Sequence, residues 1–152
     1  MKFKVIGLTG KNAAGKGTVA KFLMANGYDY YSLSDILRDE LRNLNRKETR
    51  ENLIEIGNHL RKEEGPGVLA NKLISKLSLG RNYIVDSVRN PSEVESFRQK
   101  LLAHDFFLIS VDADARVRYE RLCSRGRSGD TDSWEIFINQ ERLEENSDNP
   151  NK

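Results

Sequence analysis

The sequence has little with which to build covalent or metal cross-links. Its single cysteine, Cys123, rules out an internal disulfide framework. Cys123 together with His59 and His104 is too small a set for a Cys/His zinc site. The same shortage excludes a zinc-dependent deaminase, because that chemistry needs His and Cys ligands beside a catalytic Glu.

Long hydrophobic runs and an excess of one charge are also missing. The longest apolar runs span only a few residues, so no segment is expected to cross a membrane. The N-terminal segment MKFKVIGLTGK has too short an apolar run for a signal peptide, so the default expectation is an intracellular, cytoplasmic protein. The 25 Lys and Arg residues nearly balance the 23 Asp and Glu residues. Bulk charge therefore gives no case for nucleic-acid binding, and an anion site has to come from local clustering.

What is present is a regular alternation of apolar segments. The 152 residues amount to about one domain and are enough to bury a sizeable core. Short apolar segments predict strands and amphipathic segments predict helices between them, which indicates an α/β fold with a parallel sheet. The last predicted strand is apolar almost throughout, so we expect it to be buried on both faces in the interior of the sheet. The predicted strands are residues 2–8, 28–33, 82–88 and 105–112. The predicted helices are residues 16–26, 35–44, 46–63, 68–77, 91–101, 115–127 and 131–146.

The segment GLTGKNAAGKGT, residues 7–18, lies between the first predicted strand and the first predicted helix. Its glycines and Lys16 fit the phosphate-binding pattern Gly-x4-Gly-Lys-Ser/Thr, except that Gly17 stands where the hydroxyl residue belongs and Thr18 follows one place late. Backbone N–H groups, a helix N-terminus and the Lys16 ammonium would together hold phosphate oxygens. The alternative is a tight turn that happens to contain Lys. The strand–loop–helix context favours a nucleotide site formed by Gly10, Asn12, Ala13, Ala14, Gly15, Lys16, Gly17 and Thr18.

Gly-Lys-Gly-Thr at residues 15–18 resembles the loop of adenylate kinases and related nucleoside monophosphate kinases. The resemblance implies ATP and Mg²⁺ as cofactors, with Mg²⁺ held by ATP oxygens and water rather than by a direct protein ligand. The Thr18 hydroxyl would then meet a phosphate oxygen. It also implies a three-layer P-loop NTPase fold with the strand order 2-3-1-4, and a fifth family strand that this chain lacks.

The acceptor side of such a kinase is suggested by two further segments. LSDILR resembles the stretch that opens the family's acceptor site, which implies that Arg38 grips the acceptor phosphate and Asp35 begins the same helix. An ion pair between these two residues on a solvated helix face is the alternative. IVDSVRNP resembles the family's Asp-Gly-x-Pro-Arg stretch, which implies that Asp86 orients magnesium-bound water and Arg89 reaches the acceptor phosphate. The stretch is one residue shorter here and lacks the Pro, and a turn or helix cap is the alternative for Asp86.

The basic segment 115–127 suggests the lid. ERLCSR resembles the Glu-Arg-Leu-x-x-Arg that precedes the lid in these kinases, which implies that Arg121 and Arg125 clamp the transferring phosphate. The expected lid is short, about residues 125–132, and Arg142 is a weaker candidate for a closing charge. We expect the other arginines of this segment to lie on an exposed basic face and to pair with Glu120. They are Arg116, Arg118 and Arg127.

The remaining segments narrow the resemblance. IGNHLRKEEGPGVLANKLI and VDSVRNPSEVESFR resemble dephospho-CoA kinase-like and adenylate-kinase-related proteins, and look most like the kinase-like N-terminal domain of proteins that carry a deoxycytidylate deaminase module. We therefore expect one P-loop kinase-like domain over residues 1–152, with an acceptor-binding helical segment at about 34–64. We also expect a fragment of a longer protein with a fused or partner deaminase module. A homodimer that covers the missing sheet edge is the alternative.

Two function classes remain open. The first is an enzyme that moves the γ-phosphate of ATP to a ribo- or deoxynucleoside monophosphate. The second is a regulatory domain that binds ATP or a dNTP without turnover. The five matching positions favour the enzyme, with Lys16, Asp86, Arg121 and Arg125 as catalytic residues and Arg38 as an acceptor contact. No strong base is required, because a monophosphate has its second pKa at about 6 and is already ionised.

Overall fold

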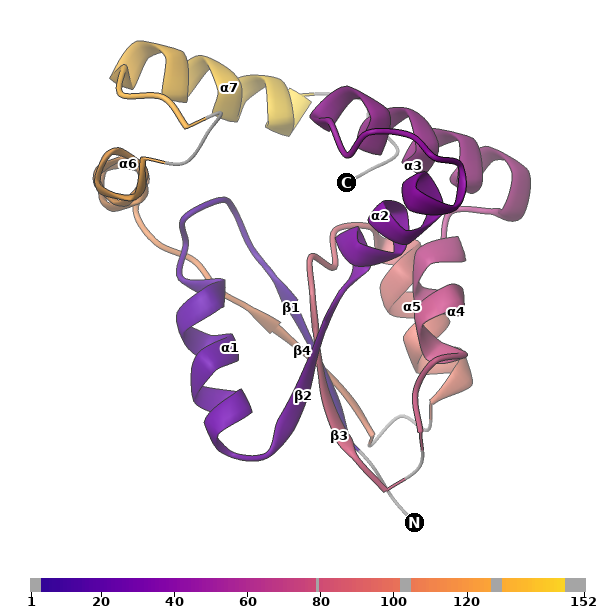
Figure 1. Cartoon of the computed structure of the whole chain (residues 1–152). Helices are drawn as coiled ribbons and strands as arrows, with labels where there is room; N and C mark the ends of the chain where they lie inside the picture. The colour runs from indigo at the N-terminus through magenta and orange to yellow at the C-terminus, as the bar shows by residue number, and fades with distance from the viewer. Residues whose placement is uncertain (1–3, 79, 102–104, 127–129, 147–152) are drawn as a thin grey trace.

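The computed structural model describes residues 4–78, 80–101, 105–126 and 130–146 (Figure 1). Within these residues the chain forms one parallel sheet in the order β2-β3-β1-β4. The strands are β1 (Val5–Thr9), β2 (Tyr28–Ser32), β3 (Asn82–Asp86) and β4 (Phe106–Ser110). The predicted α/β class and the predicted strand order are confirmed.

Each predicted helical segment contains a helix, and the boundaries differ where a side chain caps the first turn. Thr49 accepts a hydrogen bond from the backbone N–H of Asn52, so the third helix begins at residue 50 rather than 46. Ser32 accepts from Ser34 N, so the second helix begins at residue 33, which the sequence had placed in a strand. The helices are α1 (Lys16–Ala25), α2 (Leu33–Asn43), α3 (Arg50–Glu64), α4 (Val68–Ile74), α5 (Pro91–Lys100), α6 (Ala115–Arg125) and α7 (Trp134–Asn146).

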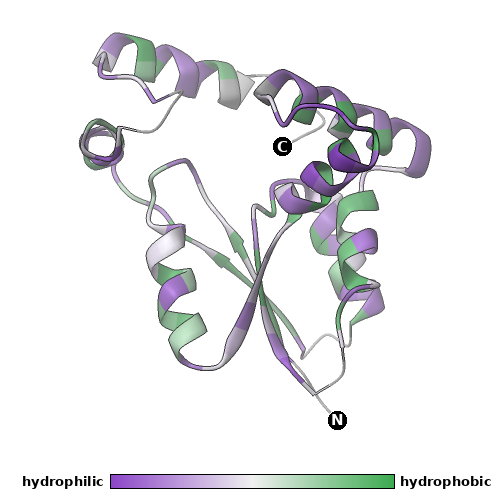
Figure 2. Cartoon of the chain, in the orientation of Figure 1, coloured by the Kyte–Doolittle hydropathy of each residue, from purple (hydrophilic) through white to green (hydrophobic). Residues whose placement is uncertain are grey.

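Helices cover both faces of the sheet, and the alternation of side chains along the strands decides what each face buries. Ile6 and Leu8 on β1 and Ile84 on β3 pack with Ala20 of α1. On the other face, Val5, Tyr83 and Val85 belong to the larger cluster that α2, α3, α4 and α5 complete. Figure 2 shows hydrophobic and hydrophilic residues in alternating bands along the helices, and hydrophobic stretches near the middle of the sheet.

The expectation that the fourth strand is buried on both faces is wrong. Phe106 is 6% exposed, whereas Phe107, Leu108 and Ile109 are 48%, 39% and 37% exposed. In the described part of the chain β4 pairs with β1 alone and lies at the edge of the sheet. An apolar run indicates that a strand is suited to burial, but it does not show that other elements cover the strand.

The four parallel strands all end on the same side of the sheet, and the predicted site segments follow these carboxyl ends (Figure 1). The glycine-rich loop follows β1, α2 follows β2, Asp86 ends β3 and α6 comes after β4. In Figure 1, α6 and α7 lie on one side of these carboxyl ends and α2 and α3 lie on the other. None of the helices in the described ranges is long and apolar enough to cross a membrane.

Candidate functional site

The loop between β1 and α1 has the backbone conformation that its glycines permit. Gly10, Ala13 and Gly15 have positive φ values of 137°, 60° and 114°. At Gly10 a Cβ atom would lie 2.1 Å from the carbonyl oxygen of Val111, so no side chain fits there. Gly15 precedes the first turn of α1, and its carbonyl accepts from Thr18 N at 3.0 Å. The loop therefore leads directly into a helix N-terminus, which favours anions.

Lys16 occupies the first position of α1, and its side chain folds back over this loop. Its Nζ donates to the carbonyl oxygens of Gly10 at 2.7 Å and Lys11 at 3.0 Å. A full positive charge thus lies at the loop. A Cβ on Gly17 would meet no atom within 4 Å, and Thr18 and Asn12 are exposed.

The two arginines expected to clamp the phosphate do approach the loop. Arg121 on α6 donates from Nη1 to the carbonyl oxygens of Ala13 and Ala14, both at 3.0 Å. Arg125, one turn further along α6, lies with Nη2 3.4 Å from the amide oxygen of Asn12. Its guanidinium also forms a two-point ion pair with Asp130 at 2.9 and 2.7 Å, and the hydrogen bond to Asp130 raises the pKa of Arg125.

Arg118 is buried, so the sequence prediction that placed it on an exposed basic face is wrong. The side chain is 3% exposed and forms an ion pair with Glu141 of α7 at 2.6 Å. Its guanidinium lies 5.5 Å from the centre of the Phe137 ring, because α7 packs back against α6. The other carboxylate contact of Glu141 is Lys11 of the glycine-rich loop, at 3.4 Å. The hydrogen bond from Arg118 holds the pKa of Glu141 below its usual value.

Of the neighbouring basic residues, Arg116 follows the sequence expectation, and the closing charge expected of Arg142 stays a prediction. Arg116 is exposed and lies 3.7 Å from Glu120, as expected for an i,i+4 pair. Arg142 is exposed on α7. Arg127 and part of the expected lid, residues 127–129, lie outside the described residues.

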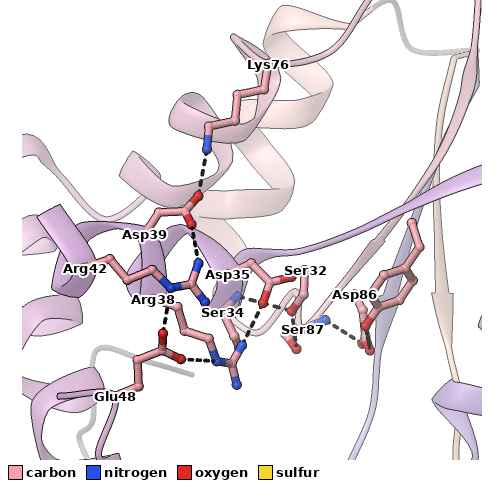
Figure 3. Close-up of polar contacts among 11 residues, drawn as sticks. Ser32, Ser34, Asp35, Arg38, Asp39, Arg42, Glu48, Lys76, Asp86 and Ser87 are labelled. Atoms are coloured by element: carbon pink, nitrogen blue, oxygen red, sulfur yellow. Dashed lines mark hydrogen bonds and ion pairs between the residues drawn. The ribbon is translucent and has the colours of Figure 1, made fainter.

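Asp86 stands at the carboxyl end of β3, where its carboxylate is oriented from two sides (Figure 3). Oδ1 accepts from the N–H of Ser87 at 2.6 Å, and Oδ2 accepts from the hydroxyl of Tyr30 on β2 at 2.9 Å. Burial and then the Asp86 charge raise the pKa of Tyr30 to about 12. Ser87 has a φ of 64°, and its hydroxyl lies 3.2 Å from that of Ser32. The Asp86 carboxylate thus accepts a hydrogen bond from the turn that follows β3, and the N-cap of α5 is Asn90.

Two of the predicted acceptor residues, Asp35 and Arg38, lie on α2, and the third, Arg89, lies between β3 and α5. Arg38 forms the i,i+3 ion pair with Asp35 at 2.8 Å, so the alternative interpretation of this pair is realised in the structure. Arg38 Nε also lies 3.6 Å from Glu48. The side chain of Arg89 is exposed and lines a cavity of about 440 Å³ together with Arg98.

Sequence reasoning missed three contacts of this site, and each joins two different elements. Tyr30 of β2 reaches Asp86 on the neighbouring strand β3, Glu141 of the last helix reaches Lys11, and Glu48 of the α2–α3 connection reaches Arg38. The residues that surround Tyr30, Glu141 and Glu48 in the sequence give no indication of these partners. Among the described residues, no group of three or more His, Cys, Asp or Glu side chains is placed to hold a metal ion.

Known proteins match most of this chain. Residues 6–149 match the family described as an AAA domain. The UPF0200 protein of Pyrococcus abyssi is 34% identical over 146 residues, which cover 93% of this chain and 78% of that protein. The UPF0200 protein of Pyrococcus furiosus is 34% identical over 143 residues, which cover 91% of this chain and 77% of that protein.

A solved structure shares the fold. The crystal structure of TT1252 from Thermus thermophilus has a TM-score of 0.60 and 22% identity, and the match covers 94% of this chain and 81% of that one. At this identity the likeness shows the fold alone. The family match and the curated relatives go further, and the chain belongs to the UPF0200 family with a nucleotide-binding, kinase-like P-loop domain of the AAA type.

Proposed function

We propose that this protein transfers the γ-phosphate of ATP to a nucleoside monophosphate, with the deoxynucleotides included among the candidate acceptors. The observation that carries the proposal is the approach of Arg121 to the carbonyl oxygens of Ala13 and Ala14. A domain that only binds a nucleotide needs the loop and its Lys, whereas phosphoryl transfer also needs cations that neutralise the charge on the moving group.

On the donor side, the loop N–H groups and the N-terminus of α1 surround the β- and γ-phosphates, and Lys16 supplies a cation to them. The contacts of Lys16 with Gly10 and Lys11 are exchanged for phosphate oxygens when ATP binds. Mg²⁺ supplies charge neutralisation on the ATP oxygens. Asp86 fits its hydration shell, because a carboxylate oriented by Ser87 N and the Tyr30 hydroxyl keeps lone pairs for water.

Between donor and acceptor, Arg121 and Arg125 hold the transferring phosphoryl group. Their positions one turn apart on α6 place both guanidinium groups on the side of the helix that faces the loop. Asp130 orients Arg125 through two contacts, so this guanidinium loses little freedom when it meets a phosphate.

The acceptor monophosphate is placed on the α2 side, with its phosphate on Arg38 and with Asp35 as the residue that orients that guanidinium. Arg89 is a further candidate contact for this phosphate. The acceptor oxygen is already ionised near neutral pH, because its second pKa is about 6. Catalysis therefore rests on position and on charge.

The alternative is a nucleotide-binding regulatory domain, of the kind associated with deoxycytidylate deaminases, that binds ATP or a dNTP without turnover. One observation favours it: the charge of Arg38 is already met by Asp35 and Glu48. In that case the α2 side would not take a second nucleotide.

A coupled ADP-release assay distinguishes the two functions. The full chain is incubated with Mg²⁺-ATP and each of the ribo- and deoxynucleoside monophosphates in turn, and ADP is followed through a coupling enzyme. The kinase proposal expects ADP release that depends on at least one acceptor. Tight ATP or dNTP binding with no acceptor-dependent ADP release would support the regulatory domain instead.

A further inference from the structure

Two arginines of α2 are joined by one carboxylate. Arg42 lies one turn after Arg38, and Glu48 reaches both of them (Figure 3). The Oε1 atom of Glu48 accepts from Arg42 Nε at 2.7 Å, and its Oε2 atom lies 3.6 Å from Arg38 Nε. The two oxygens of a single anionic group thus bridge two guanidinium groups, which is also how a phosphate is bound by paired arginines.

Each arginine has a second partner that belongs to α2 itself. Asp35 pairs with Arg38 at 2.8 Å, and Asp39 pairs with Arg42 at 3.0 Å. Both acids precede their arginine by three residues, so the helix fixes these pairs. Glu48 lies outside the helix, in the connection between α2 and α3. It is the partner that can leave while the guanidinium groups keep their orientation.

The connection that carries Glu48 does not depend on this residue for its anchorage. Arg46 donates to Asn52 at 2.7 Å and forms an ion pair with Glu55 at 2.7 Å. Asn52 in turn donates to the carbonyl oxygen of Lys47 at 2.8 Å. These contacts tie the connection to α3, so loss of the Glu48 contacts leaves it in place.

The Glu48 contacts are weak enough to be exchanged. The side chains of Arg38, Arg42 and Glu48 are 37%, 60% and 35% exposed. Ion pairs with this exposure change an equilibrium constant by at most about fivefold. A phosphate offers more oxygens and more negative charge than a carboxylate, and its paired contacts with arginine are among the stronger ones.

We propose that Arg42 and Arg38 together form a two-arginine site for the phosphate of a nucleoside monophosphate, and that Glu48 occupies this site in competition with the acceptor. The inference rests on the proposed function, which places the acceptor phosphate on Arg38. It adds Arg42 as a second contact and Glu48 as the anion that sets the acceptor affinity.

The test measures acceptor binding at a filled donor site. The full chain is saturated with Mg²⁺ and a non-hydrolysable ATP analogue, so that the glycine-rich loop cannot take up the probe. The common ribo- and deoxynucleoside monophosphates, from AMP and dAMP to UMP and dTMP, are then titrated by calorimetry. Wild type is compared with Glu48→Gln, Arg42→Gln and the control Asp29→Asn, which removes one carboxylate charge from an ion pair with Arg81 at the start of β2.

Glu48→Gln is expected to tighten monophosphate binding about two- to fivefold, because a weak competing ion pair is lost. Arg42→Gln is expected to weaken it about tenfold, the equivalent of one charge-assisted contact. Asp29→Asn is expected to bind like wild type. Equal tightening by Glu48→Gln and Asp29→Asn, wild-type affinity in Arg42→Gln, or no monophosphate binding to any variant would overturn the inference.

ADP release by the same variants separates this inference from the proposed function. If the binding pattern is found but no acceptor supports ADP release, the anion site stands and the transfer reaction fails. If ADP release depends on an acceptor but its KM is the same in wild type, Arg42→Gln and Glu48→Gln, the transfer reaction stands and the two-arginine site fails.

Discussion

Arg121 of α6 donates a hydrogen bond from Nη1 to the carbonyl oxygen of Ala13 at 3.0 Å, across 108 positions of the sequence. Ala13 belongs to the glycine-rich loop that precedes α1, and its φ of 60° is the left-handed conformation that a tight anion-binding loop requires. The contact fixes a guanidinium next to the backbone that would surround a phosphate. The helix after β4 and the loop after β1 therefore form one site.

Replacement of both clamp arginines should slow turnover far more than it weakens ATP binding. Under the proposed function, Arg121→Ala with Arg125→Ala removes two cations that would act on the charge developing in the transition state. We expect kcat to fall about 100-fold or more. Steady-state kinetics and calorimetry with ATP measure the two effects.

Arg116→Ala is the matched control for this pair, because Arg116 lies on the same helix, is exposed and pairs with Glu120. It should have the kcat of wild type. A double variant that turns over as fast as Arg116→Ala would show that α6 provides no clamp.

Lys16→Ala should lower ATP affinity tenfold or more without unfolding the protein. The ammonium group supplies one charge-assisted contact, worth about 1.5–3 kcal/mol, while the loop conformation depends on glycines and backbone. Titration with ATP and circular dichroism measure the two properties. Lys21→Ala, an exposed residue of the same helix, is the control. Unchanged ATP affinity in Lys16→Ala would remove the basis for a phosphate-binding loop.

Two glycines of the loop should respond differently to the same substitution. At Gly10 a Cβ would lie 2.1 Å from the carbonyl oxygen of Val111, at a φ of 137°, whereas a Cβ at Gly17 would meet no atom within 4 Å. Gly10→Ala should lower the free energy of unfolding by at least about 2 kcal/mol. Gly17→Ala should change it by less than about 1 kcal/mol. Urea denaturation compares them, and equal stability of the two variants would contradict the close approach of β1 and the segment after β4.

The sequence predicted the parts of the site that local pattern determines. The spacing of Gly10, Gly15 and Lys16 between an apolar segment and an amphipathic one indicated the loop, and the i,i+4 spacing of Arg121 and Arg125 indicated a shared helix face. These predictions depend on residues a few positions apart, whose geometry the backbone fixes.

Contacts between distant segments could not be predicted in this way. Arg118 has the same local pattern as the exposed Arg116, and only the packing of Phe137 and Glu141 from α7 makes it buried. Similarly, the apolar residues of β4 do not reveal that the strand lies at the sheet edge in the described residues. Pairing of this edge with a second copy or a further segment stays a prediction.

The ion pair between Arg118 and Glu141 should make stability depend on acidic pH. The pKa of Glu141 is lowered from 4.5 in the folded protein, so its contribution is complete above about pH 4.5 and is lost as the pH falls through the folded value. Glu141→Gln leaves a buried guanidinium without its carboxylate. We expect a loss of about 3 kcal/mol at pH 7, or about 6–12 °C in Tm.

Thermal unfolding of wild type and Glu141→Gln at pH values from 7 to 3 checks this result. The difference in Tm should shrink as the pH falls below about 4.5, because the unfolded chain takes up a proton there and the native carboxylate does so only at its lower pKa. The exposed Glu135 of α7 provides the control variant Glu135→Gln, which should follow wild type. A Glu141→Gln difference that is constant from pH 7 to 3 would argue against a role for the charge.

Direct observation of the transferred phosphate is the sharpest test of the proposed reaction. The full chain is incubated with ATP labelled at the γ-phosphate, Mg²⁺ and the panel of ribo- and deoxynucleoside monophosphates, and the labelled products are separated by chromatography. We expect label in a nucleoside diphosphate derived from at least one acceptor, and its loss in the Arg121→Ala and Arg125→Ala double variant. Label that remains in ATP, or appears only as inorganic phosphate with every acceptor, would contradict the proposed transfer reaction.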